Sequence, residues 1–119
     1  MLRLSTASGA RTKKPFHFQP KATLFAFGGV YDVWKGDGMA ITSFSIVTTD
    51  TAPSTQQYYD RTPMVLEESQ FEDWLRGPPE LAAGMMKPYD GAIETWEVGG
   101  EVGNVKNNRP ELMERVGLL

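Results

Sequence analysis

Residues Leu24–Trp34 have the sequence LFAFGGVYDVW, and this stretch decides the fold that we expect. Its apolar residues occupy both alternating sets of positions, whereas a strand with one face in water carries them on only one set. The pattern predicts a central strand that is covered on both sides. Gly28 and Gly29 interrupt this strand, and glycines inside a strand favour a bulge or tight packing over the close approach of a ligand.

A hairpin is predicted directly after this strand. Lys35–Gly38, with the sequence KGDG, has the composition of a turn, and Ile41–Thr49 alternates as a second strand. On the N-terminal side, an extended segment begins at Pro15–Phe18. Residues 1–14 are polar and rich in small side chains, which predicts a flexible loop or hairpin tip rather than a packed element.

Helices are predicted in the second half of the chain. Phe71, Trp74 and Leu75 follow the i, i+3, i+4 spacing of a helix, and Gly77 with the two prolines after it ends that helix. The other expected elements are a connection with one helical turn over Asp50–Asp60, a short strand over Met64–Leu66, a helix over Glu80–Met86, a strand over Ala92–Val98 and a closing helix over Pro110–Val116. Strands precede helices without βαβ alternation, so the order predicts an α+β fold.

The composition excludes several kinds of active site. The chain has 119 residues, the size of one domain, with no cysteine and a single histidine, His17. These counts exclude thiol nucleophiles, disulfides, zinc fingers, iron–sulfur clusters and the usual Ser/His or Cys/His pairs, and we expect no metal or other cofactor. No apolar run approaches the roughly 18 residues of a membrane span and no signal peptide is recognisable, so we expect a cytoplasmic protein without a membrane partner.

The charge distribution is uneven along the chain. The formal net charge is −3, which argues against a surface that binds nucleic acid over its whole extent. Residues 1–31 nevertheless contain basic side chains and no acidic one; the basic residues are Arg3, Arg11, Lys13, Lys14 and Lys21. This basic end is either a solubilising terminus or an arm that contacts phosphates.

Three segments, in order, resemble the SOS-response-associated peptidase (SRAP) family of abasic-site processing proteins. Leu24–Lys35 (LFAFGGVYDVWK) resembles the family's FAFAGLWD-x-W strand. Within Ser43–Leu66, SFSIVTTDTA and YYDRTPMVL resemble its SFTILTT and HDRMPVIL segments. Val98–Leu112 (VGGEVGNVKNNRPEL) resembles its VS-x-x-VNNPRNDGPEL ending, so the resemblance covers the chain from about Leu4 to Leu112.

The resemblance implies a curved, barrel-like mixed β-sheet with flanking helices. It also implies a positively charged cleft for single-stranded DNA, in which an abasic site is trapped covalently during the SOS response to DNA damage. The sequence TASGARTKKPFHF, which begins at Thr6, is similar to the family segment that follows its GFYEW motif. We therefore expect residues 1–119 to form a single domain that corresponds to the C-terminal half of an SRAP domain.

The covalent chemistry that the resemblance implies depends on three groups. An N-terminal cysteine forms an imine and then a thiazolidine with the abasic aldehyde, and the glutamate of GFYEW assists; in the family both precede the segment matched here. The third group is the histidine that opens HDRMP, and Tyr59 stands in its place. A phenol ordinarily releases its proton only near pH 10, against about 6.5 for an imidazole, which makes it a poor proton shuttle. We expect the family's crosslinking, peptidase and lyase activities to be absent.

The same resemblance implies a surface for single-stranded DNA. Arg61 stands in the arginine position of HDRMP, and the threonines at 48 and 49 match the family's TT pair. Arginine side chains and threonine hydroxyls commonly contact phosphates. The alternative for Arg61 is a salt bridge with Asp60 or another nearby acid. The residues expected to contact DNA are Arg61, Thr48, Thr49, Lys13 and Lys14.

Two alternatives to an inactive SRAP protein stay open. One is a non-catalytic protein or scaffold fragment that binds single-stranded DNA, with Trp34 or Tyr59 stacking on bases. The other is a residual lyase in which the amine of Met1 forms the imine. The remaining aromatic residues of the strands are expected in the core; they are Phe16, Phe18, Phe25, Phe27 and Tyr31.

A half domain leaves apolar strand surface uncovered. Burial of such surface supplies about 25 cal/mol per Å², so several hundred Å² left in water remove a large part of a small domain's stability. We therefore expect a marginally stable monomer. It either self-associates through unpaired sheet edges or requires the other half of the domain as a separate chain.

Overall fold

The computed structural model describes residues 2–6 and 13–117. Contacts between residues divide the chain into two compact units. The terminal unit consists of Met1–Lys21 and Gly91–Leu119, and the central unit consists of Ala22–Asp90. A single domain over residues 1–119 stays a prediction.

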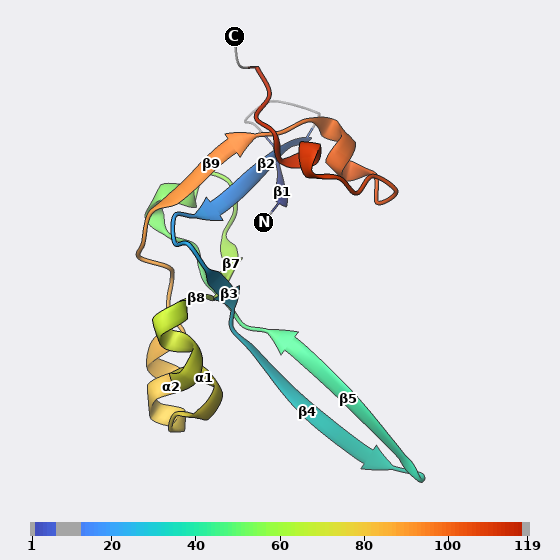
Figure 1. Cartoon of the computed structure of the whole chain (residues 1–119), viewed down its shortest axis with the longest axis vertical. Helices are drawn as coiled ribbons and strands as arrows, with labels where there is room; N and C mark the ends of the chain where they lie inside the picture. Colours follow the sequence, from blue (N-terminus) through green and yellow to red (C-terminus); the bar gives the residue numbers. More distant parts are fainter. Residues whose placement is uncertain (1, 7–12, 118–119) are drawn as a thin grey trace. The chain divides into compact units, whose positions relative to one another are not determined.

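A three-stranded antiparallel sheet forms the terminal unit (Figure 1). Its strands are β1 (Leu2–Thr6), β2 (Lys13–Pro20) and β9 (Ile93–Glu97), in the order β1-β2-β9. The loop predicted over residues 1–14 is wrong for Leu2–Thr6, which pairs residue by residue with β2. Its leucines alternate with polar residues, and pairing with β2 satisfies the backbone that a loop would leave to water. Phe18, on the middle strand, is completely buried, as expected for a core aromatic residue.

The C-terminal segment of the terminal unit is largely extended where the sequence predicts a helix. Of the expected helix Pro110–Val116, only Pro110–Met113 forms a single 3₁₀ turn, η4. Beyond it, Arg115 makes a β-bridge with Val98, and the Val116 N–H donates to the Glu97 carbonyl at 3.0 Å. Pairing with the end of β9 thus takes the backbone groups that a longer helix would use. Another 3₁₀ turn, η3, covers Gly100–Gly103.

Three antiparallel strand pairs form the β-structure of the central unit. They are β3 (Phe25–Phe27) with β8 (Val65–Glu67), β4 (Gly29–Gly36) with β5 (Met39–Ile46), and β6 (Thr48–Asp50) with β7 (Arg61–Pro63). The pairs meet at Gly28, Val47 and Met64. The Gly28 N–H donates to the Met64 carbonyl at 2.9 Å, and the Met64 N–H donates to the Val47 carbonyl at 2.8 Å. The Val47 N–H donates in turn to the Gly28 carbonyl at 2.9 Å. The predicted hairpin is confirmed, and so is the helical turn before Asp60, as η1 (Pro53–Thr55).

Two short helices complete the central unit. They are α1 (Phe71–Arg76), preceded by the 3₁₀ turn η2 (Glu68–Gln70), and α2 (Pro79–Met85), and they contact each other. Trp74 of α1 donates from its indole N–H to the Gly29 carbonyl at 3.1 Å, which ties the helix to the start of β4. Gly77 ends α1, as predicted, and its N–H donates to the Asp73 carbonyl at 2.9 Å.

The α+β class is confirmed, with several small antiparallel sheets. Within residues 2–6 and 13–117, the strands do not close into a barrel. None of the helices in this part of the chain has the length and apolar character needed to cross a membrane.

The predicted central strand differs from expectation in both continuity and burial. It breaks at Gly28 into β3 and β4, which pair with different partners. Tyr31 and Trp34 of β4 are 76% and 52% exposed, so the expected cover on both faces, and the core position of Tyr31, are wrong. The reason is that the central unit pairs β4 with β5 alone and places no layer of its own over the hairpin (Figure 1).

Candidate nucleic-acid interface

Arg61 is the predicted site residue that the structure defines best. It lies on β7 directly opposite Asp50 of β6. Its Nη2 donates to the Thr48 carbonyl at 2.7 Å and to the Thr48 hydroxyl at 3.2 Å, and its Nε donates to the same hydroxyl at 3.3 Å. The guanidinium is therefore held against the backbone of the neighbouring strand.

The remaining partner of Arg61 is an acid. Its Nη1 lies 3.2 Å from the Asp50 carboxylate, so the predicted alternative of a nearby acid is found, with Asp50 in place of Asp60. Both side chains are largely exposed, and an ion pair in water of this kind contributes at most about 1 kcal/mol. A guanidinium carries five N–H groups. Four hydrogen bonds to described residues therefore leave Arg61 one further N–H for water or a phosphate.

The two threonines of the TT pair point to different environments. Thr48 is exposed and shares its hydroxyl with Arg61, whereas Thr49 is buried and its hydroxyl donates to the Asp50 carbonyl at 2.9 Å. Neighbouring residues of a strand face opposite sides, so only one of the two can belong to the surface around Arg61. Thr48 is that residue.

Tyr59, in the position of the family histidine, is buried in the central unit with 7% of its surface exposed. Lys14 is exposed and lies on β2 of the terminal unit, opposite Ser5. The side chain of Lys13, and both Arg11 and Met1, lie outside the part of the chain that the structure describes. The structure thus brings Arg61 and Thr48 together, and it leaves Lys14 on a different unit.

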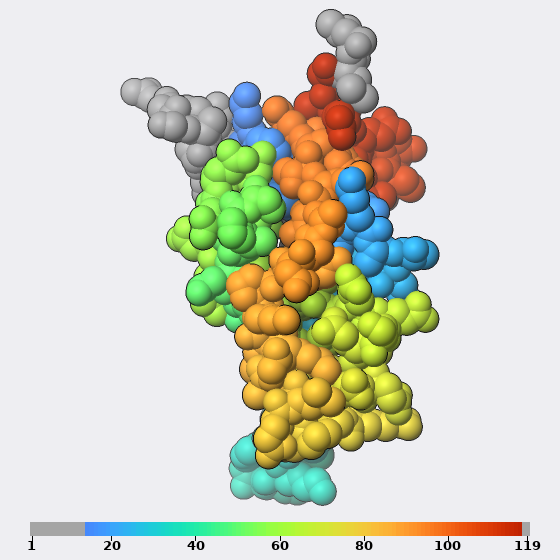
Figure 2. All heavy atoms as spheres, turned by 90° about the vertical axis from the view of Figure 1, so that its left-hand side faces the viewer, coloured from blue at the N-terminus to red at the C-terminus, as the bar shows by residue number. Residues whose placement is uncertain are grey.

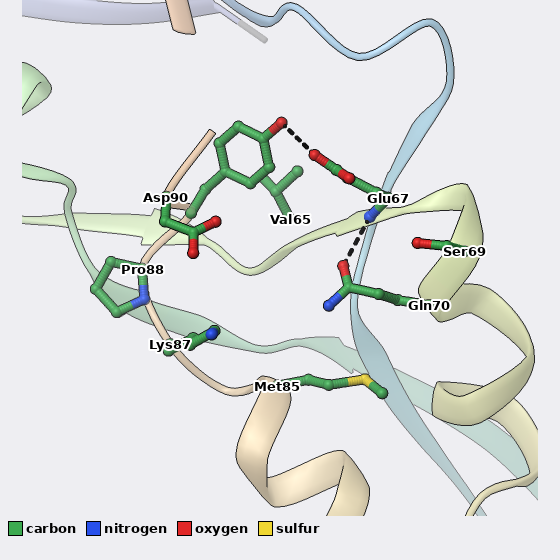
Figure 3. Close-up of a pocket in the computed structure, with 9 residues that line it drawn as sticks. Val65, Glu67, Ser69, Gln70, Met85, Lys87, Pro88 and Asp90 are labelled. Atoms are coloured by element: carbon green, nitrogen blue, oxygen red, sulfur yellow. Dashed lines mark hydrogen bonds between the residues drawn. The ribbon is translucent and has the colours of Figure 1, made fainter. Parts of the chain in front are cut away.

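A polar pocket of about 240 Å³ lies elsewhere in the central unit (Figure 3). Tyr89 donates from its hydroxyl to the Glu67 carboxylate at 2.9 Å, and Gln70 accepts from the Glu67 N–H at 3.0 Å. Burial is the main cause that raises the pKa of Tyr89 above its usual value, and this hydrogen bond and the negative charge of Glu67 raise it further. The phenol therefore stays a donor. Sequence reasoning missed this pocket, because its walls come from residues 65–70 and 85–90 and no spacing rule connects them.

No group of three or more metal-binding side chains occurs among the residues that the structure describes.

A sequence profile described as "SOS response associated peptidase (SRAP)" matches residues 6–105. The chain belongs to the SRAP family. The resemblance seen in the three sequence segments is confirmed.

The curated relatives of this SRAP chain are abasic-site processing proteins. It is 32% identical to "Abasic site processing protein YoqW" of Bacillus subtilis, over 87% of this chain and 49% of that protein. It is 29% identical to mouse "Abasic site processing protein HMCES", over 81% of this chain and 28% of that protein. A crystal structure of a Bacteroides thetaiotaomicron protein superimposes with a TM-score of 0.79 at 25% identity, over 97% of this chain and 53% of that one. The chain spans about half the length of YoqW.

The only histidine of this SRAP chain lies on β2, outside the HDRMP-like segment. His17 is buried, its Nε2 lies 3.1 Å from the Gln19 side-chain oxygen, and its ring stacks on Trp96 with 4.6 Å between ring centroids. Its Nδ1 has no hydrogen-bond partner in the described part of the chain. Burial lowers the pKa of His17 below 6.5, and the hydrogen bond with Gln19 opposes this shift in part.

This burial predicts acid sensitivity. In the unfolded chain His17 takes up a proton near pH 6.5, and in the folded chain it does so only at lower pH. The unfolded state therefore binds more protons as the pH falls from about 7 towards 5, and the free energy of unfolding decreases over that range. We expect His17→Phe, which keeps a ring on Trp96, to remove most of this decrease in urea titrations at pH 7, 6 and 5. An unchanged pH dependence in the variant would assign the acid sensitivity to other groups.

Proposed function

We propose that this chain takes part in abasic-site processing by holding single-stranded DNA, and that it does not itself form the covalent bond to the lesion. The names of its SRAP relatives support the first part. The orientation of Arg61 is the observation that carries the proposal. A guanidinium fixed by several hydrogen bonds loses little conformational freedom when it binds a phosphate.

Two observations support the second part. The 119 residues contain no cysteine, so the chain has no thiol for a thiazolidine. Tyr59, where the resemblance places the family's histidine, has only 7% of its surface exposed, so its phenol has little access to a sugar arriving from solvent. Proton transfer requires the donor and acceptor within hydrogen-bond reach.

Fluorescence titration of a labelled single-stranded oligonucleotide, with and without an abasic site, tests DNA binding. We expect Arg61→Gln to weaken binding about 10- to 100-fold, because a hydrogen bond to a charged group contributes about 1.5–3 kcal/mol. The slope of log affinity against log salt should fall by about 0.7, as expected for one phosphate contact to a single strand. A flat titration of the unaltered chain contradicts the proposal.

The matched control is Arg76→Gln. Arg76 is also exposed and also pairs with an acid, Glu72, at 3.1 Å, but it lies on helix α1 and not on β6 or β7. We expect this variant to bind like the unaltered chain. Arg61→Lys, which keeps the charge but not the forked geometry, should retain the salt slope while losing part of the affinity.

The covalent step is tested by incubating the chain with abasic single-stranded DNA, followed by borohydride reduction and denaturing electrophoresis. We expect no adduct with or without borohydride. An adduct trapped only by borohydride would show an imine with an amine of the chain, which is the residual-lyase alternative.

A further inference from the structure

The polar pocket around Tyr89 is lined by two segments that flank the helical pair of the central unit. Residues 65–70 lead through β8 and η2 into α1, and residues 85–90 begin at the last residue of α2. Figure 2 shows both segments at the surface of the molecule, the first in yellow-green and the second in gold to orange. A molecule bound in the pocket therefore contacts the chain on both sides of α1 and α2.

The volume of the pocket limits the size of a ligand. About 240 Å³ is below the roughly 300–1,000 Å³ of pockets for drug-sized molecules. It corresponds to the volume of about eight water molecules in the liquid, which suits a solute of about ten non-hydrogen atoms. A nucleotide is too large for the pocket to enclose.

Two internal hydrogen bonds orient the polar groups of this pocket. The Tyr89 hydroxyl donates to one oxygen of the Glu67 carboxylate at 2.9 Å, and the Gln70 side-chain oxygen accepts from the Glu67 N–H at 3.0 Å. The second Glu67 oxygen and the Gln70 NH₂ group have no hydrogen-bond partner within residues 2–6 and 13–117. A carboxylate oxygen is an acceptor and an amide NH₂ donates twice, so both groups can bind a ligand.

The pocket also contains charges of both signs that are not paired with each other. Lys87 and Asp90 line it, and neither side chain forms a salt bridge with any residue that the structure describes. Figure 3 shows the Asp90 carboxylate, the end of Lys87 and the Gln70 amide around one common space. Together with Glu67, the pocket presents two carboxylates and one ammonium group.

A ligand that satisfies these groups carries the opposite charges in the same numbers. Two ammonium groups pair with the carboxylates of Asp90 and Glu67, and one carboxylate accepts hydrogen bonds from Lys87 and Gln70. A neutral sugar would leave the three charges uncompensated, and a phosphate would be repelled by the two carboxylates. We propose that this pocket binds a diamino acid, which is an α-amino acid with a second ammonium group on its side chain, such as L-lysine. The proposal does not depend on DNA binding by Arg61.

Nuclear magnetic resonance of the nitrogen-labelled full chain tests this proposal, with L-lysine as the probe and sodium chloride as the ionic-strength control. We expect saturable shifts of the amide signals of residues 65–70 and 85–90 with a Kd of about 1–10 mM, as for a ligand of this size held by exposed polar contacts. L-Norleucine lacks the second ammonium group and cadaverine lacks the carboxylate, so each should bind about fivefold more weakly. Equal binding of the three probes, or no saturable shift in these two segments, overturns the proposal.

Two substitutions assign the binding to this pocket. Asp90→Asn and Lys87→Gln each remove one charge from an exposed side chain, and each should weaken L-lysine binding about fivefold. Lys87→Gln should not weaken the binding of cadaverine, which has no carboxylate. The control is Glu80→Gln, which removes an exposed acid of α2 outside the pocket lining and should leave the Kd unchanged. Binding that survives both pocket substitutions, or that Glu80→Gln weakens equally, overturns the proposal.

Discussion

Replacement of Phe18 by alanine should lower the free energy of unfolding by about 3–5 kcal/mol, the range measured when a buried phenylalanine is truncated. Phe18 is completely buried on the middle strand of the β1-β2-β9 sheet. The substitution removes the transfer free energy of the ring and leaves a cavity that the paired strands cannot collapse around. Small domains have a total stability of about 5–15 kcal/mol, so the expected loss is a large fraction of the total. Urea denaturation followed by far-UV circular dichroism measures the loss.

Phe44→Ala is the matched control for this prediction. It removes the same ring from a strand of the same chain, but Phe44 is 78% exposed on β5. We expect a change within about 0.5 kcal/mol, as for other exposed positions. Similar losses for the two variants would mean that Phe44 is covered in solution, which would contradict the exposed hairpin.

Local elements of the fold could be predicted because the conformation of each depends on residues that are only a few positions apart in the sequence. The turn between β4 and β5 places Asp37 and Gly38 at φ angles of 50° and 73°, a region that aspartate tolerates and glycine adopts readily. Helix α1 was predictable in the same way from the spacing of Phe71 and Trp74 and from the stop at Gly77. Neither element depends on distant parts of the chain for its conformation.

Burial of the LFAFGGVYDVW segment could not be predicted in the same way. An alternating or continuous apolar pattern shows which faces of a strand are able to be covered, but not whether any layer covers them. Tyr31 is an aromatic residue within an apolar run, which is typical of a core position, yet 76% of its surface is exposed. The strand Leu2–Thr6 and the extended end near Arg115 were missed for a related reason, because pairing with β2 and β9 overrides weak local preferences.

The residues of the candidate site could be named from the sequence, whereas their contacts could not. The resemblance identified Arg61 and the TT pair, and the register of β6 with β7 decides what they do. Asp50 lies directly across from Arg61, so it takes the ion pair that a reading of the sequence alone assigned as readily to the adjacent Asp60. The side-chain alternation of β6 puts Thr48 and Thr49 on opposite faces, and only the structure shows that Thr48 is the exposed one and Thr49 the buried one.

Gly28→Ala should lower the free energy of unfolding by about 1–3 kcal/mol, as expected when a methyl group is forced into a packed interior. Gly28 lies where the three strand pairs of the central unit meet, and a Cβ atom there would overlap the terminal methyl group of Met64 and lie 3.6 Å from Leu66 Cδ1. A methionine usually swings aside, but Met64 is completely buried, so its methyl group can move only by displacing neighbours. Chemical denaturation compares the variant with the unaltered chain.

A double-mutant cycle identifies the cause of this loss. If overlap with Met64 is responsible, Gly28→Ala combined with Met64→Ala should be at least about 1 kcal/mol less destabilised than the sum of the single variants, because the second change removes the methyl group in question. Gly84→Ala is the control for glycine replacement itself. Apart from its chain neighbours and the nearby backbone of α2 itself, nothing lies within 4 Å of a Cβ placed there, so we expect a gain of about 0.5–1 kcal/mol from higher helix propensity. Strict additivity of the Gly28 and Met64 changes would move the cause from side-chain overlap to the backbone at the junction.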